Sequence, residues 1–238
     1  SFSEEDFLAK FPEVNELANI KSTFISHMMS EDIRFSHYKK IGKIVLNEIK
    51  KGVKGIIIGH GTDTLAVTSA ALAFMFENLP VPVILVGSQR SIDRGSSDAA
   101  MNVLCALEFI IKTDFKGVAI CMHESMSDES CLILPACKTR KMHTSRRDAF
   151  KAINDKPIAR VNYKTKKIEF LKEYNKRLNG KLIFKPNFED KVAIIKTYPH
   201  MFPDLIESLT KNKYKGLILE ATGIGQAPTN IKENLPNY

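Results

Sequence analysis

Residues 53–64 read VKGIIIGHGTDT, a short β-branched run followed by a polar turn that contains glycine. A run of this kind is typical of a strand that is buried on both faces of a parallel sheet. The polar residues of the turn can begin a helix, which the apolar pattern predicts over residues 63–78. A strand, a turn and a helix in this order form the repeating unit of α/β domains.

The same order of elements recurs on both sides of this stretch. We expect strands over residues 19–25, 53–59, 82–87 and 117–122, and helices over residues 3–11, 33–49, 63–78 and 97–112. Pro12 should end the first of these helices, because proline lacks a backbone N–H. The alternation predicts an α/β fold with a largely parallel sheet and flanking helices.

The regular alternation ends after residue 122. Short strands are expected over residues 131–136, 158–163 and 167–171, and again over 192–198 and 216–221 around a helix over 203–212. Residues 164–191 are rich in lysine and poor in long apolar runs, so we place a domain boundary near Phe188. We therefore expect one α/β domain over residues 1–188 and the beginning of a smaller one over 189–238. Two strands cannot cover a sheet, so the second domain should continue beyond this chain.

Composition narrows the range of partners and cofactors. The formal net charge of +8 permits an acidic partner such as tRNA, but lysines spread over a solvated surface explain it as well, so direct tRNA contact stays open. The four cysteines form no CxxC pair and the six histidines show no ligand spacing, so we expect no metal site. No apolar run is long enough for a membrane span and residues 1–6 do not resemble a signal peptide, which predicts a cytoplasmic protein.

Four polar segments are expected to converge at one edge of the sheet: residues 60–64, residues 87–90, a turn over residues 141–144, and residues 222–225. Parallel strands present their carboxyl ends at one sheet edge, where binding sites form. Thr62 and Asp63 allow two interpretations. They can cap the following helix, or the threonine can stabilise developing negative charge while the carboxylate holds a substrate ammonium. Gly61 would let the backbone approach a ligand closely.

The sequence HGTDT at residues 60–64 resembles the signature of the bacterial-type L-asparaginase family. Residues 86–90, VGSQR, are similar to the VGxxR motif of that family, and residues 26–29, SHMM, are similar to its substrate-side SxxM turn. Lys141 falls where the family has its catalytic lysine. The resemblance extends from about Phe7 to the end of the chain, and it implies an asparaginase-like fold.

Within this family, the chain is similar to the D-type glutaminase subunits of archaeal Glu-tRNA(Gln) amidotransferases. Residues 87–91, 93–94 and 96–102 carry this likeness, and the octet HTSRRDAF at 143–150 is its strongest signal. It implies that glutamine is hydrolysed and that the ammonia passes to a tRNA-binding E-type subunit, which uses ATP and Mg to make Gln-tRNA(Gln). It also implies a homodimer within a heterotetramer and no cofactor in this chain. A free L-asparaginase and a non-catalytic fragment of the fold remain alternatives.

The resemblance implies a catalytic triad of Thr62, Asp63 and Lys141. Burial and the neighbouring carboxylate would tune the proton affinity of Lys141, so that it takes the proton of the Thr62 hydroxyl. Thr62 then acts as a nucleophile or activates the attacking water. Asp63 would also bind the α-ammonium group of glutamine.

The resemblance further implies that Ser26 binds the α-carboxylate, that Gly61 admits the substrate, and that the backbone of Gly87 and Ser88 lies near the amide. His27 stands where the family commonly has Gln or Glu, which bears on ammonium recognition. The chain begins downstream of the place where the family carries a glycine-threonine-rich turn with a first nucleophilic threonine. We therefore expect this chain alone to release no ammonia.

Overall fold

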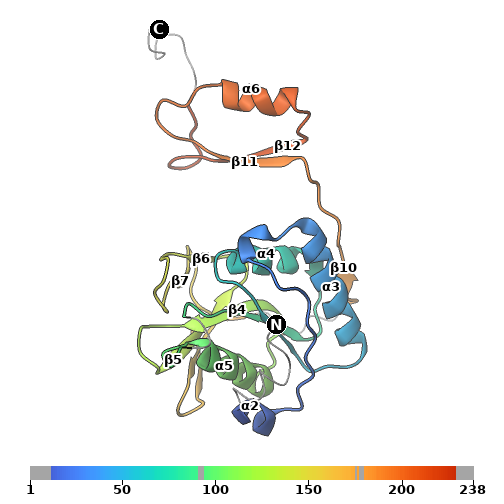
Figure 1. Ribbon diagram of the computed structural model, residues 1–238, viewed down its shortest axis with the longest axis vertical. Helices are drawn as coiled ribbons and strands as arrows, with labels where there is room; N and C mark the ends of the chain where they lie inside the picture. The colour runs from blue at the N-terminus through green and yellow to red at the C-terminus, as the bar shows by residue number, and fades with distance from the viewer. Residues whose placement is uncertain (1–11, 91–93, 175, 177–179, 229–238) are drawn as a thin grey trace. The chain divides into compact units, whose positions relative to one another are not determined.

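The computed structural model describes residues 12–90, 94–174, 176 and 180–228 (Figure 1). The chain divides into two compact units, Ser1–Pro186 and Asn187–Tyr238. A six-stranded sheet in the order β1-β3-β4-β5-β8-β9 forms the centre of the first unit. Its strands are β1 Ile56–Gly59, β3 Pro82–Val86, β4 Gly117–His123, β5 Ser130–Pro135, β8 Ala159–Asn162 and β9 Ile168–Phe170.

The sheet has a parallel half and an antiparallel half. Strands β1, β3 and β4 pair in parallel, whereas β5, β8 and β9 extend the sheet by antiparallel pairing. All five residues of β3 are buried, as the apolar run predicted for a strand covered on both faces. The expected α/β class is confirmed, and strands β1 and β3 of the parallel half lead into the turns over residues 60–64 and 87–90 that were singled out in the sequence.

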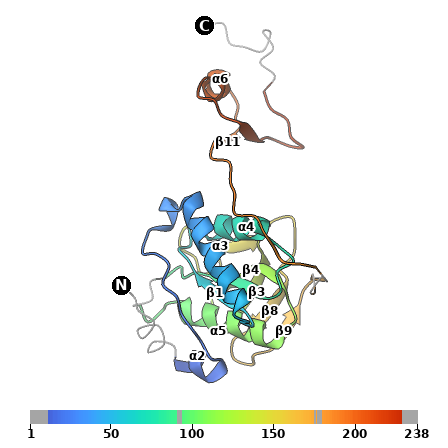
Figure 2. The ribbon, with the colours of Figure 1, turned by 90° about the vertical axis from the view of Figure 1, so that its right-hand side faces the viewer.

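Helices cover both faces of this sheet (Figures 1 and 2). On one face lie α3, Phe35–Lys50, and α4, Leu65–Met75; on the other lie α5, Ala99–Lys112, and α2, Pro12–Leu17. Most of α5 is buried, and it forms the main core with strands β3 to β5. None of the helices in the described ranges has the length and apolar character needed to cross a membrane.

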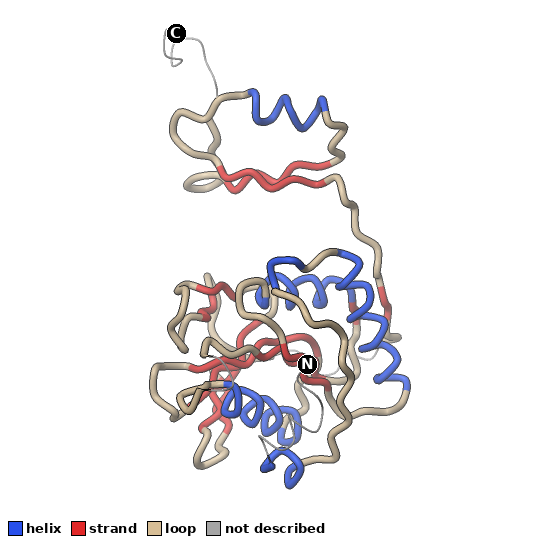
Figure 3. The backbone as a smooth tube through the Cα atoms, in the orientation of Figure 1, coloured by secondary structure: helices blue, strands red, loops and turns tan. Residues whose placement is uncertain are grey.

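Shorter elements complete the two units. In the first, the 3-10 turn η1, Ser30–Asp32, precedes α3; β2, Phe76–Glu77, pairs with β10, Ile183–Phe184; and β6, Thr139–Lys141, pairs with β7, Phe150–Ala152. In the second, β11, Val192–Lys196, and β12, Gly216–Glu220, run in parallel on either side of α6, Asp204–Lys211, in the chain (Figure 3).

The structure corrects three of the expected elements. Residues 19–25 form a loop and no strand, because β propensity alone does not make a strand without a ladder partner (Figure 3). Lys141 ends strand β6 and does not lie in a turn, and the β6–β7 hairpin was not foreseen. Pro12 is the first residue of α2, where its missing N–H costs nothing, while the helix expected over 3–11 lies outside the described residues.

Candidate active site

Three of the predicted site residues meet at the carboxyl edge of the parallel strands. The Lys141 ammonium donates to the Thr62 hydroxyl over 2.9 Å and to Asp63 Oδ1 over 2.7 Å. The Lys141 side chain is 13% exposed and that of Asp63 is 63% exposed. The lysine is therefore largely covered, whereas the carboxylate can still be reached by a ligand.

The turn between β1 and α4 presents Thr62 and Asp63 to this lysine. The N-cap of α4 is Thr64, so the interpretation of Thr62 and Asp63 as capping residues is wrong. The Thr64 hydroxyl does not cap the helix either, because it donates to the carbonyl oxygen of Ser30 over 2.7 Å. The side chains of Thr62 and Asp63, which precede this N-cap, bond Lys141 instead.

Close contact with η1 requires glycine at position 61. A Cβ atom on Gly61 would lie 2.6 Å from the Cβ of Ser30, which is closer than real Cβ contacts come. Together with the bond from Thr64, this contact fixes the turn against the residues before α3. Ser30 was not singled out in the sequence, because a small residue that packs on a glycine leaves no pattern there.

Gly87 has a similar role at the end of the neighbouring strand. A Cβ atom at this position would come within 2.9 Å of both Thr62 Cγ2 and Leu65 Cδ1. The absence of a side chain therefore lets Thr62 pack directly on the turn that follows β3. This places the backbone of the predicted amide-binding turn next to the predicted catalytic threonine.

The buried carboxylate of Asp98 holds the turn over residues 87–90. It accepts hydrogen bonds from the backbone N–H groups of Gln89 and Arg90 and from the Ser88 hydroxyl, each over 3.0 Å. The side chain of Ser88 is therefore engaged within the turn, and only its backbone is left for the predicted role. Asp98 was noted in the sequence as part of a family likeness, but its role as an anchor was missed.

The ring of His60 stabilises the turn between β1 and α4 through two hydrogen bonds. Its Nδ1 lies 2.7 Å from the carbonyl oxygen of Gly61 and its Nε2 lies 2.9 Å from the Thr68 hydroxyl. A carbonyl oxygen can only accept, so Nδ1 carries the proton and Nε2 accepts from Thr68. Burial lowers the pKa of His60, which favours this neutral form.

The remaining predicted site residues lie outside the cluster of Lys141, Thr62 and Asp63. Ser26 and His27 are exposed in the loop before η1, and within the described ranges no hydrogen bond joins their side chains to the lysine cluster. The loop is tied to α3, because Lys40 Nζ donates to the carbonyl oxygen of Ile25 over 2.6 Å. Residues 222–225 belong to the second unit, where they form a turn.

No group of three or more His, Cys, Asp or Glu side chains in the described part of the chain is arranged to hold a metal ion. Cys105, Cys121 and Cys131 are buried free thiols, whereas Cys137 is exposed. Burial raises the pKa of the Cys121 thiol, so this group behaves as a small apolar side chain.

An α/β sheet whose first turn presents a Thr-Asp pair to a covered lysine defines an asparaginase-type protein. Residues 1–176 match the family described as "Asparaginase, N-terminal", and the chain belongs to this family. It is 44% identical over 232 residues to the D-type subunit of the Glutamyl-tRNA(Gln) amidotransferase of Pyrococcus furiosus, covering 97% of this chain and 52% of that protein. The D-type subunit from Methanosarcina barkeri is 44% identical over 228 residues, covering 96% and 53%.

Solved structures support the same fold. The thermostable L-asparaginase from Thermococcus kodakarensis superposes with a TM-score of 0.78 at 29% identity, covering 95% of this chain and 65% of that one. L-asparaginase I from Vibrio cholerae gives a TM-score of 0.75 at 28% identity, covering 85% and 58%. The chain spans about half the length of the curated relatives that it matches.

Proposed function

We propose that this chain carries the glutaminase site of a tRNA-dependent amidotransferase, which hydrolyses glutamine to supply ammonia for converting Glu-tRNA(Gln) to Gln-tRNA(Gln). The main support is the contact of Lys141 with both Thr62 and Asp63 beside the turn at Gly87. The 44% identity to proteins named as the D-type component of this enzyme favours glutamine over other amides.

The chemistry starts with the proton of Thr62. Lys141 in its amine form takes this proton, and the Thr62 oxygen then attacks the side-chain amide carbon or removes a proton from an attacking water. Lys141 returns the proton to the amide nitrogen as the C–N bond breaks and ammonia leaves. Water supplies the oxygen of the glutamate product, either by attacking the amide directly or by cleaving the ester between Thr62 and the acyl group, and the Thr62 hydroxyl regains its proton. Asp63 holds the lysine in place and faces the α-ammonium group of the substrate.

We also propose that this chain acts within a larger assembly. Ammonia would pass to a tRNA-binding E-type subunit, which uses ATP and Mg to amidate Glu-tRNA(Gln), and two copies of this chain would form a homodimer within a heterotetramer. The three buried free thiols are compatible with a reducing compartment such as the cytoplasm. Direct contact between this chain and tRNA is not needed for this role.

Ammonia release by the complete gene product, purified with and without its tRNA-binding partner, tests the proposal. We expect glutamine to be the preferred substrate and Thr62→Ala to lower the rate by at least about 100-fold, a typical contribution of proton-transfer catalysis. Thr165→Ala, which removes an exposed hydroxyl that bonds Asn162 and the Lys167 N–H, is the matched control. Preference for asparagine without a partner would favour a free L-asparaginase, and no release from either amide would favour a non-catalytic protein.

A further inference from the structure

The loop over residues 142–149 holds most of the HTSRRDAF octet. It connects two parts of the candidate site, strand β6 with Lys141 and the turn over residues 87–90. It begins directly after Lys141 and is closed by a hydrogen bond from the Met142 N–H to the carbonyl oxygen of Ala149 over 2.7 Å. The Gln89 side-chain amide donates to the carbonyl oxygen of Arg146 over 2.8 Å. One loop therefore touches both the lysine strand and the turn over residues 87–90.

A second route, buried at Asn102 and His123 and exposed at Asp128, joins the same loop and turn. The side-chain amide of Asn102 donates to the carbonyl oxygen of Gly87 over 2.9 Å, and its oxygen lies 2.7 Å from Nδ1 of His123. The other ring nitrogen of His123 lies 3.3 Å from Asp128, which is also bonded by Arg147. Asn102 and His123 are fully buried, so no water competes for these bonds.

The direction of each hydrogen bond between Gly87, Asn102, His123 and Asp128 follows from which atoms carry protons. Asn102 uses its two N–H groups on Gly87 and Asp98, so its oxygen must accept from the His123 ring and Nδ1 carries a proton. The Asp128 carboxylate accepts only, so Nε2 bonds to it only when that nitrogen is protonated as well.

The surroundings of His123 shift the pKa of its ring in opposite directions. Burial has the largest effect and leaves the pKa of His123 lowered overall, and the positive charge of Arg147 also lowers it. The carboxylates of Asp128 and Asp98 act against this and raise the pKa. Cys131 on β5 also faces the chain, and its thiol donates to the oxygen of Asn102.

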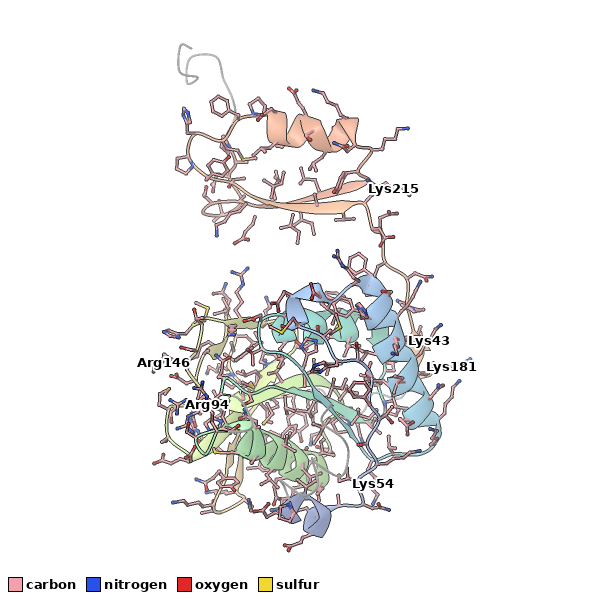
Figure 4. All side chains as sticks on the ribbon, in the orientation of Figure 1. Lys43, Lys54, Arg94, Arg146, Lys181 and Lys215 are labelled. Carbon is pink, nitrogen blue, oxygen red and sulfur yellow. The ribbon has the colours of Figure 1, made fainter. Side chains whose placement is uncertain are left out.

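The two neighbouring arginines of the loop have different surroundings. The Arg147 side chain is 11% exposed and reaches across to Asp128 and to the carbonyl oxygen of Met126. Arg146 is 52% exposed and pairs with Asp148 inside the loop, and Figure 4 shows it at the periphery of the first unit. Of these two arginines, Arg147 is the one that bonds Asp128 and so connects the loop to His123.

We propose that Arg147 is a positioning residue which, through the exposed Asp128 and the buried His123 and Asn102, holds the Gly87 turn in register with Lys141. An amide bound at the turn would then lie at a defined distance from the lysine and from Thr62. The kinetic part of this inference rests on the proposed function, whereas the spectroscopic part does not.

Paired substitutions, Arg147→Met and the control Arg146→Met, test this role in the complete gene product. With ¹⁵N-labelled glycine and histidine, we expect Arg147→Met to move the Gly87 amide resonance and to raise the pKa of the His123 ring, because a nearby cation is lost. Asp128→Asn, which keeps the side-chain shape, should lower that pKa. Arg146→Met should change neither signal, and His123→Gln and Gly87→Ala assign them.

Kinetics of ammonia release provide the second readout. We expect Arg147→Met to lower kcat by about tenfold or more with a smaller change in KM, because a misplaced amide is still bound but lies off the reaction geometry. Arg147→Lys should recover part of the loss, since one ammonium cannot make both Nη contacts. Equal kcat in the two Met variants, or an unmoved Gly87 signal in both Arg147→Met and Asp128→Asn, would overturn the inference. An inactive wild type would reject the proposed function, while the resonances would still decide the inference.

Discussion

The ammonium of Lys141 lies 2.9 Å from the hydroxyl of Thr62, although the two residues are 79 positions apart in the chain. Strand β6 brings the lysine to the edge of the sheet where the turn after β1 presents the threonine. The same ammonium bonds Asp63, so one cation joins a hydroxyl and a carboxylate that are neighbours in sequence. This contact is the geometric basis of the proposed proton transfer.

Removing the lysine should abolish most of the activity. We expect Lys141→Met to lower the rate of ammonia release by about 10²- to 10⁴-fold, because Thr62 loses the group that takes its proton. Circular dichroism should show an unchanged fold, since the methionine stem replaces the apolar part of the side chain. Lys138→Met alters an exposed lysine just before β6 and is the control. Comparable loss in both variants would speak against a specific role of Lys141.

A methyl group at position 87 should displace the threonine. In Gly87→Ala the new Cβ would meet Thr62 Cγ2 and Leu65 Cδ1 at 2.9 Å, so one of them must move. We expect a loss of about 1–3 kcal/mol in the free energy of unfolding, together with a lower kcat. Gly59→Ala is the matched control, because its Cβ meets nothing within 4 Å. Urea unfolding and ammonia release measure the two effects; wild-type kcat in Gly87→Ala would contradict the contact.

The buried Asp98 should be a major source of stability for the second turn. Hydrogen bonds to a charged group contribute about 1.5–3 kcal/mol each, and Asp98→Ala removes the acceptor of several at once. We therefore expect a loss above about 3 kcal/mol in the free energy of unfolding. The exposed Asp32→Ala should cost far less. Thermal unfolding of the two variants checks this, and similar melting temperatures would show that the turn is held by other means.

His60 should make stability depend on pH. Burial lowers its pKa below the ordinary value of 6.5, so the unfolded chain takes up the proton more readily than the folded one. Its contribution to stability is therefore complete above pH 6.5 and is lost as the pH falls through the lowered pKa of the folded state. We expect the stability difference between wild type and His60→Gln to shrink between about pH 7 and about pH 5. His27→Gln, at an exposed position, controls for a general effect of losing a histidine.

Most of the sheet and its helices could be predicted because their signals are local. The apolar run of β3 and the helical stripe of α3 were expected within a few residues of their observed bounds. The expected strand over residues 19–25 was wrong, since a strand needs a partner that local propensity does not supply. The β6–β7 hairpin was missed because it is short and lies among polar residues that carry no periodic pattern.

The sequence by itself determined the family, the α/β class and the identity of Thr62, Asp63 and Lys141 as candidates, because these rest on short patterns of neighbouring residues. Only the tertiary structure decided that the lysine bonds both of the other two, that Ser88 is engaged by Asp98, and that Ser26 and His27 lie apart from the cluster. It also showed the series of hydrogen bonds from Gly87 through the buried Asn102 and His123 to Asp128 and Arg147. Such contacts depend on how distant strands and loops pack, and residue spacing along the chain does not encode them.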